Sequence, residues 1–139
     1  MAAYPLTMAQ RVELAAAESQ QIRAGHVPTA VTATVSDNVL VITLHDALSK
    51  AEKALAQTAE GAAQVQDFHR RLFQSSVDVL RSEIKRITGV AVREAAVEIE
   101  TSTGAVIQTF TSGTMVQVFQ LAGAISALDW NASAPLETS

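Results

Sequence analysis

A regular series of apolar residues near the middle of the chain places the strongest constraint on its fold. Its members are separated alternately by four and three positions: Phe73, Val77, Leu80, Ile84 and Ile87. This spacing puts every member on one face of an α-helix, as at the a and d positions of a heptad. The pattern therefore predicts a long amphipathic helix over residues 62–88, which Gly89 ends and which buries one side.

A shorter helix is predicted ahead of this long one. Ser49 and Glu52 have the spacing of a capping box, in which the side chain of each residue binds the backbone N–H of the other. The box predicts a helix over residues 50–58. Glu60 and Gly61 follow it, and we expect them to break the chain between the two helices.

Strands are predicted for much of the remaining chain, because β-branched residues recur there at alternate positions between turn residues. The predicted strands are a hairpin over residues 29–44 and a meander over residues 90–100, 105–111 and 114–121. With a first helix over residues 7–24, the order is α-β-β-α-α-β-β-β. This order is typical of the α+β class: an antiparallel sheet of about four to five strands, with the long amphipathic helix and shorter helices packed on it.

The predicted core is mainly aliphatic, because only 4% of the residues are aromatic. Its few large members are expected to be Phe68, Phe73, Phe110 and Phe119. Residues 39–44 are apolar at nearly every position, which predicts a central strand that is covered on both faces.

The composition argues against several classes of function. A net charge of −4 argues against a nucleic-acid partner, and the absence of cysteine excludes thiolate nucleophiles, disulfides and Cys-based zinc sites. No apolar run reaches the roughly 18 residues that span a bilayer, so no direct membrane insertion is expected. The first residues lack the basic and apolar segments of a secretory signal. We therefore expect a cytoplasmic protein.

Three short motifs carry a resemblance to a known family. They are V-I-T-L at residues 41–44, L-S-K-A-E-K-A-L at 48–55 and I-K-R-I-T-G-V-A-V at 84–92, with Glu60-Gly61 before the last. Over about residues 8–119 the chain resembles the MpsC-like family, small bacterial proteins named for a sodium-translocating, membrane-potential-generating system. The resemblance implies a helix, a hairpin, a long helix and further strands, and it supplies no catalytic residues. Residues 101–130 are longer than in the short form of the family.

Basic residues on the predicted helices are the candidate ligand-binding groups. His69, Arg70 and Arg71 could bind an anion such as a carboxylate or bicarbonate, and Lys53 could contribute to a ligand or partner site. The alternative is a solvated helix face, since Asp67 and Arg71 have the spacing of an i, i+4 ion pair.

No catalytic or metal-binding set of residues is recognisable. His45 and Asp46 are adjacent, so their side chains point to opposite faces of a strand and cannot easily form a base–carboxylate pair. Glu52 is explained by the capping box. The spacings H-x-x-x-H, D-x-D and E-x-x-H, which are typical of metal sites, do not occur. We therefore expect no enzymatic activity, no cofactor and no metal.

A basic cluster lies toward the end of the long helix and just after it: Arg81, Lys85, Arg86 and Arg93. Cations there are favoured by the negative end of the helix dipole. We interpret the cluster as part of a helix terminus rather than as a nucleic-acid contact.

The apolar residues 115–130 near the C-terminus either belong to the core, as an edge strand and a short final helix, or form an interaction surface. An edge strand there would invite pairing with a second copy of the chain. The candidate interface residues are Met115, Val116, Val118, Phe119, Leu121 and Trp130. One domain over residues 1–130 is predicted, followed by a disordered tail over residues 131–139.

Together these features predict a non-enzymatic accessory or regulatory protein of the MpsC-like family. We expect it to act as a homo-oligomer, with a dimer favoured, and through an unidentified protein partner. A link to membrane ion or bicarbonate transport is an expectation that rests on the resemblance. The alternative is a small-molecule or anion-binding module.

Overall fold

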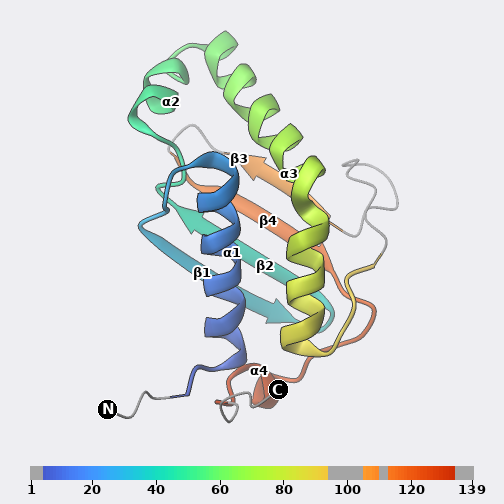
Figure 1. The fold of residues 1–139 in the computed structure, drawn as a ribbon. Helices are drawn as coiled ribbons and strands as arrows, with labels where there is room; N and C mark the ends of the chain where they lie inside the picture. The colour runs from blue at the N-terminus through green and yellow to red at the C-terminus, as the bar shows by residue number, and fades with distance from the viewer. Residues whose placement is uncertain (1–4, 94–104, 110–112, 134–139) are drawn as a thin grey trace.

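The computed structural model describes residues 5–93, 105–109 and 113–133 (Figure 1). Its helices are α1 (Met8–Ala24), α2 (Lys50–Leu55), α3 (Ala59–Thr88) and α4 (Ala127–Trp130). Its strands are β1 (Ala30–Ser36), β2 (Val39–His45), β3 (Ala105–Thr109) and β4 (Met115–Gln120).

The strands form one antiparallel sheet in the order β1-β2-β4-β3. β1 and β2 are a hairpin in which Ala33 lies opposite Ile42, and β4 pairs with the other side of β2, where Gln117 lies opposite Ile42. The α+β class, the antiparallel sheet and the long helix predicted from the sequence are confirmed.

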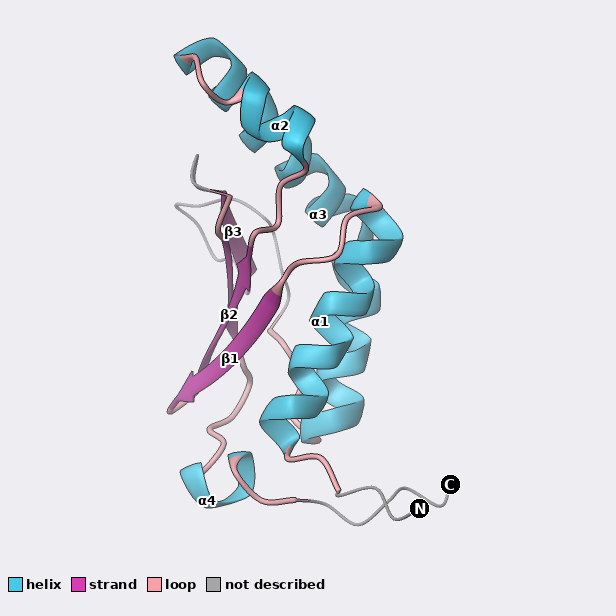
Figure 2. Cartoon of the chain, turned by 90° about the vertical axis from the view of Figure 1, so that its left-hand side faces the viewer, coloured by secondary structure: helices cyan, strands magenta, loops and turns pink. Residues whose placement is uncertain are grey.

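Helices α1 and α3 lie side by side on one face of this sheet (Figures 1 and 2). Because side chains alternate along a strand, Leu40, Ile42 and Leu44 are fully buried beneath the helices, whereas Val41 and Thr43 between them are only half-buried. β2 is central, as predicted. In the part of the chain that the structure describes, however, helices cover only one of its faces (Figure 2).

The apolar series on α3 forms the centre of the core, as predicted. All five of its members, from Phe73 to Ile87, are at most 6% exposed, and they pack with residues of α1 and of the sheet. Phe68 was expected in this core but is 51% exposed. It lies off the buried stripe, in which Val65 and His69 precede Phe73 at four-residue spacing. Phe110, which was also expected in the core, lies outside the described residues.

The C-terminal part differs from the predicted meander. β4 lies between β2 and β3, inside the sheet rather than at its edge. Of the strand predicted over residues 90–100, Val92 forms an isolated bridge with Leu121, and the part from residue 94 onward lies outside the described residues. The chain then forms α4, which the predicted order lacks but which matches the short final helix of the core interpretation of residues 115–130. Within the predicted tail, Ser133 bridges to Thr7 beside the start of α1.

Gly61 lies inside α3, although the sequence predicted that it would break the chain between two helices. α3 begins at Ala59, and Gly61 N–H donates a hydrogen bond of 3.0 Å to the side-chain oxygen of the N-cap Thr58. A Cβ on Gly61 would lie 1.8 Å from the carbonyl oxygen of Leu55. Glycine is therefore needed here because the end of α2 packs directly on α3, not because the chain must bend.

Candidate functional site

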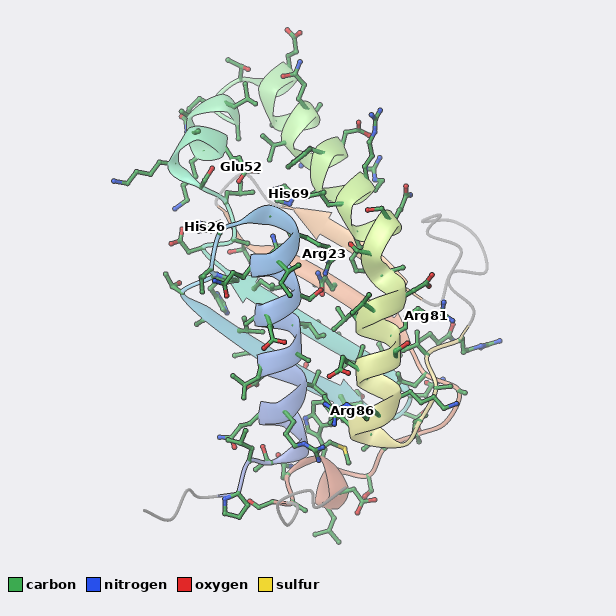
Figure 3. The ribbon with its side chains drawn as sticks, viewed as in Figure 1. Arg23, His26, Glu52, His69, Arg81 and Arg86 are labelled. Atoms are coloured by element: carbon green, nitrogen blue, oxygen red, sulfur yellow. The ribbon has the colours of Figure 1, made fainter. Side chains whose placement is uncertain are left out.

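Charged side chains meet where β2 ends and α2 packs against α3. β2 ends at His45, and the chain turns at Asp46, whose φ of 54° lies in the left-handed region that Asp tolerates. The N-cap Ser49 then starts α2. This path brings Glu52 of α2 next to His69 of α3 (Figure 3).

Glu52 and His69 form a hydrogen-bonded pair that links the two helices. The distance from His69 Nε2 to Glu52 Oε2 is 2.6 Å. Because an ionised carboxylate only accepts hydrogen bonds, Nε2 carries the donated proton. The His69 side chain is 2% exposed and that of Glu52 is 20% exposed. The pair thus reinforces a small apolar cluster at the same junction, which consists of Leu48, Ala56 and Val65.

The carboxyl group of Glu52 also caps its own helix. Its Oε1 accepts a hydrogen bond of 2.9 Å from Ser49 N–H, and Ser49 Oγ accepts one of 3.2 Å from Glu52 N–H, which confirms the predicted capping box. Burial opposes ionisation, but the hydrogen bonds from Ser49 and His69 outweigh it and hold the pKa of the Glu52 carboxyl below its ordinary value. Glu52 is therefore an ionised acceptor at neutral pH.

Asp46 forms an ion pair at this junction, with Lys53. The hydrogen bond from the Lys53 ammonium is the main reason that the pKa of the Asp46 carboxyl lies below its ordinary value. His26 Nε2 donates to the backbone carbonyl of Asp46 at 2.9 Å, and the carbonyl of Gly113 accepts from Ala47 N–H at 2.7 Å. The turn after β2 therefore connects the loop after α1, helix α2 and the start of β4.

This arrangement argues for a structural role of His69. A histidine that a carboxylate orients can act as a general base when its second ring nitrogen reaches a substrate. His69 instead lies in the buried stripe of α3, between Val65 and Phe73. No serine or threonine hydroxyl of the described residues bonds to its ring.

The four predicted ligand residues do not converge on one site. His69 and Lys53 are each held by the carboxylate described above. On the outer side of α3, Arg71 Nε lies 3.0 Å from Asp67 Oδ2, and Arg70 Nη1 lies 3.9 Å from Asp67 Oδ1. Both arginines are exposed, so they fit the solvated helix face that was the alternative interpretation.

The six predicted interface residues divide between core and surface. Four of them are fully or almost fully buried within the chain: Met115, Phe119, Leu121 and Trp130. These four belong to the core, which corrects their prediction as interface residues and confirms the expectation that Phe119 is a core residue. Val116 and Val118 point to the opposite side of β4, which the helices leave uncovered, and they are only half-buried.

Polar side chains also lie within the main core or pack against it. The guanidinium carbon of Arg23 lies 5.9 Å from the ring centroid of Phe73, and burial lowers the pKa of Arg23 (Figure 3). Its Nη2 donates to Ser19 Oγ at 2.6 Å. Gln20 Nε2 and Gln117 Oε1 are buried without a hydrogen-bond partner among the described residues. The core therefore contains more polar groups than the apolar pattern of α3 predicts.

The basic cluster near the end of α3 borders a surface pocket. The pocket has a volume of about 230 Å³, and its lining comprises Arg81, Ser82, Lys85, Ala91 and Val92. Arg81 Nη1 donates to Asp78 Oδ1 at 3.1 Å, whereas its buried Nε has no hydrogen-bond partner among the described residues. Across the same residues, no group of three or more His, Cys, Asp or Glu side chains is placed to hold a metal ion.

The pair of Glu52 and His69 was missed at the level of the sequence, because its members are 17 residues apart and lie on different helices. One signal was available. His69 falls at the four-residue spacing of Val65 and Phe73, which predicts that its imidazole is buried, and a buried imidazole requires a hydrogen-bond partner.

Comparison with known proteins assigns the family. No curated protein and no solved structure matches the chain. In the described part of the chain, no helix is both long and apolar enough to cross a membrane. One family model matches residues 7–113, and its description is Na⁺-translocating membrane potential-generating system (MpsC). The match runs from the N-cap of α1 almost to β4 and includes the Glu52–His69 pair. The chain therefore belongs to the MpsC family.

Proposed function

We propose that the chain is a non-enzymatic accessory protein that acts by binding other protein chains, first of all a second copy of itself. Its site of action is the cytoplasmic side of the membrane-potential-generating system for which the family is named. The observation that carries the proposal is the face of the sheet that lies opposite α1 and α3 (Figure 2). We call it the open face.

The middle of the open face consists of two rows of small branched side chains that cross three strands, and a row of Ser36, Val39 and Gln120 flanks it at one end and His45 at the other. One row crosses the middle of the strands and the other lies beside it: Thr34, Val41 and Val118, then Thr32, Thr43 and Val116. None of these six residues is charged, and none is fully buried. A surface of this kind favours contact with another apolar surface.

A second copy fits this face because two such surfaces pack without bringing like charges together, although the chain has a net charge of −4. Packed sheets lie about 10 Å apart with interdigitating side chains. Three strands of about six residues each give a patch of roughly 300 Å² per copy. This area is small for a stable interface, so we expect a weak dimer that forms in the micromolar range.

The non-enzymatic part of the proposal is supported by the way the charged groups at the α2–α3 junction pair with one another. Glu52 binds His69 and Asp46 binds Lys53, so these groups hold the fold together. We expect that alanine at His69 or Glu52 changes stability, while any activity of the folded fraction is unchanged.

Light scattering of the protein at increasing concentration tests the proposal. Val118→Lys places a cation in the middle of the open face, where it meets its own copy across the interface, so the dimer is expected to dissociate. Val79→Lys is the matched control, because Val79 is 66% exposed on α3 and lies away from this face. A wild-type protein that stays monomeric at high micromolar concentration, or equal effects of both variants, contradicts the proposal.

An anion-binding module is the second candidate function, and the pocket beside Arg81 and Lys85 favours it. Two cations one helical turn apart suit a small anion such as phosphate, as does the buried Nε of Arg81, which has no hydrogen-bond partner in the described part of the chain. Stabilisation by phosphate over chloride at equal ionic strength, lost in Lys85→Gln, supports this candidate. No shift in the melting temperature with phosphate rules it out.

A further inference from the structure

Strand β1 forms one edge of the sheet, and within the described part of the chain it pairs only with β2. Its Ala33 N–H points away from β2, because Glu13 Oε2 on α1 accepts a hydrogen bond from it at 2.9 Å. Backbone groups alternate between the two sides of a strand, so the N–H groups of Val31 and Val35 point the same way. The outer edge of β1 therefore presents the backbone N–H groups of Val31, Ala33 and Val35, and the Glu13 carboxylate binds that of Ala33.

A groove of about 350 Å³ lies beside this edge, between α1 and the start of β1. Apolar side chains contribute most of its lining: Leu6, Leu14, Ala17, Pro28, Ala30 and Val31. Leu14 is 58% exposed and Leu6 is 40% exposed, and large aliphatic side chains that gather at an open groove indicate an interaction site. Among the described residues, Glu13 is the one charged member of the lining.

We propose that this groove binds an extended segment of a partner protein, which adds to the sheet as a strand beside β1. Strand addition derives its affinity from main-chain hydrogen bonds along a free edge, and its specificity from pockets that accept alternate side chains. The outward-facing backbone groups of β1 supply the main-chain hydrogen bonds, and the apolar groove supplies a pocket for side chains. The proposal shares with the proposed function the premise that the chain binds other proteins, but it uses the β1 edge rather than the open face.

Glu13 determines the chemistry of the partner. In the free protein, the Glu13 carboxylate accepts the hydrogen bond from Ala33 N–H. When a strand is added beside β1, a carbonyl oxygen of that strand accepts this hydrogen bond instead. Once that carbonyl replaces it, Glu13 is left charged in a mostly apolar groove, which is unfavourable without a paired cation. The bound segment therefore carries apolar residues at alternate positions and one Lys or Arg opposite Glu13.

A second copy of β1 does not meet this requirement. The sequence of β1, A-V-T-A-T-V-S, contains no basic residue. Pairing of two β1 edges also brings the Glu13 carboxylates of both copies toward the same interface, and like charges that face each other across a strand pair are destabilising. A segment from a different protein is therefore the better occupant.

Selection from a display library of random peptides of about ten residues tests the inference with the full chain. The selected peptides are expected to alternate apolar residues and to share one Lys or Arg. Leu14→Glu should weaken their binding about tenfold or more, because it places a second carboxylate in the groove. Ile22→Glu is the matched control, since Ile22 is 79% exposed on the same helix and does not line the groove.

The role of Glu13 is tested with a selected peptide and its Lys→Gln version. Glu13→Gln should weaken binding of the Lys peptide about fivefold to tenfold and leave binding of the Gln peptide nearly unchanged. In the wild-type protein, the amide NMR signals of Val31, Ala33 and Val35 should shift when the peptide is added.

Several results would overturn the inference while leaving the proposed function intact. One is a selection that yields no binder, and another is an equal loss of binding in Leu14→Glu and Ile22→Glu. A third is loss of peptide binding in Val118→Lys, which would place the peptide on the open face. A dimer that Leu14→Glu dissociates would place a second copy in the groove, and this result would overturn both the inference and the open-face dimer of the proposed function.

Discussion

Two glutamates of this chain make the same kind of contact in opposite surroundings. Glu52 and Glu13 each accept a hydrogen bond of 2.9 Å from a backbone N–H, of Ser49 and Ala33 respectively. Glu52 also binds the buried His69 and closes the junction between α2 and α3. Glu13 lies at an open groove and occupies a strand edge that no described strand covers. The Glu52 carboxylate stabilises the packing of two helices, and the Glu13 carboxylate binds a backbone N–H at an exposed strand edge.

The two sides of the sheet also differ in that one is closed and the other is open. Side chains beneath α1 and α3 form a closed core, whereas the open face presents threonine and valine to solvent. Closed regions should respond to substitution with a loss of stability. Open regions should keep their stability and respond with a change in association.

The largest effect is expected from Phe119→Ala. Phe119 is fully buried, and its ring centroid lies 5.9 Å from that of Phe73, so the change should lower the free energy of unfolding by about 3–5 kcal/mol. Val116→Ala on the open side of the same strand should cost less than about 1 kcal/mol. Urea unfolding followed by the fluorescence of Trp130, the single tryptophan, measures both. Equal losses would show that the open face is covered after all.

A smaller loss is expected from Gly61→Ala at the α2–α3 junction. The new Cβ would meet the carbonyl oxygen of Leu55 at 1.8 Å, so the helices must move apart, at about 1–3 kcal/mol. Gly123→Ala is the control, because its Cβ would make an ordinary contact with Val90 at 3.8 Å. Thermal unfolding of both variants separates a packing requirement from a general glycine effect. Wild-type stability of Gly61→Ala would mean that the junction is loose.

These positions show which features the sequence can predict. The helix caps and the stripe on α3 depend on residues at most four positions apart, so spacing predicts them. The same local reasoning assigned a helix break to Gly61, because its contact with Leu55 arises only when α2 folds back on α3. Tertiary packing also decides that β4 lies inside the sheet, so Phe119, which the sequence placed among both the expected core residues and the candidate interface residues, belongs to the core.

The smallest effects on stability are expected from replacing each of the two glutamates, Glu52 and Glu13, with glutamine. Glu52→Gln keeps the capping box, since Gln10 forms the same box with Thr7 at the start of α1. It removes the charge that faces His69, so we expect a loss of about 1–2 kcal/mol at neutral pH. Glu13→Gln should stay within about 0.5 kcal/mol of the wild-type value, because its surroundings are open. A loss at Glu13 as large as that at Glu52 would remove the distinction between them.

The pH dependence of the Glu52→Gln difference identifies its cause. The pKa of Glu52 in the folded protein lies below its ordinary value of 4.5, so folding favours the ionised form. The resulting stability is present above about pH 4.5 and is lost as the pH falls through the folded pKa. The variant has no carboxyl group at this position. The difference in free energy of unfolding between the wild type and the variant should therefore decrease as the pH falls below about 4.5. A gap that stays constant down to about pH 3 would mean that Glu52 acts through packing, and that its charge does not hold α2 to α3.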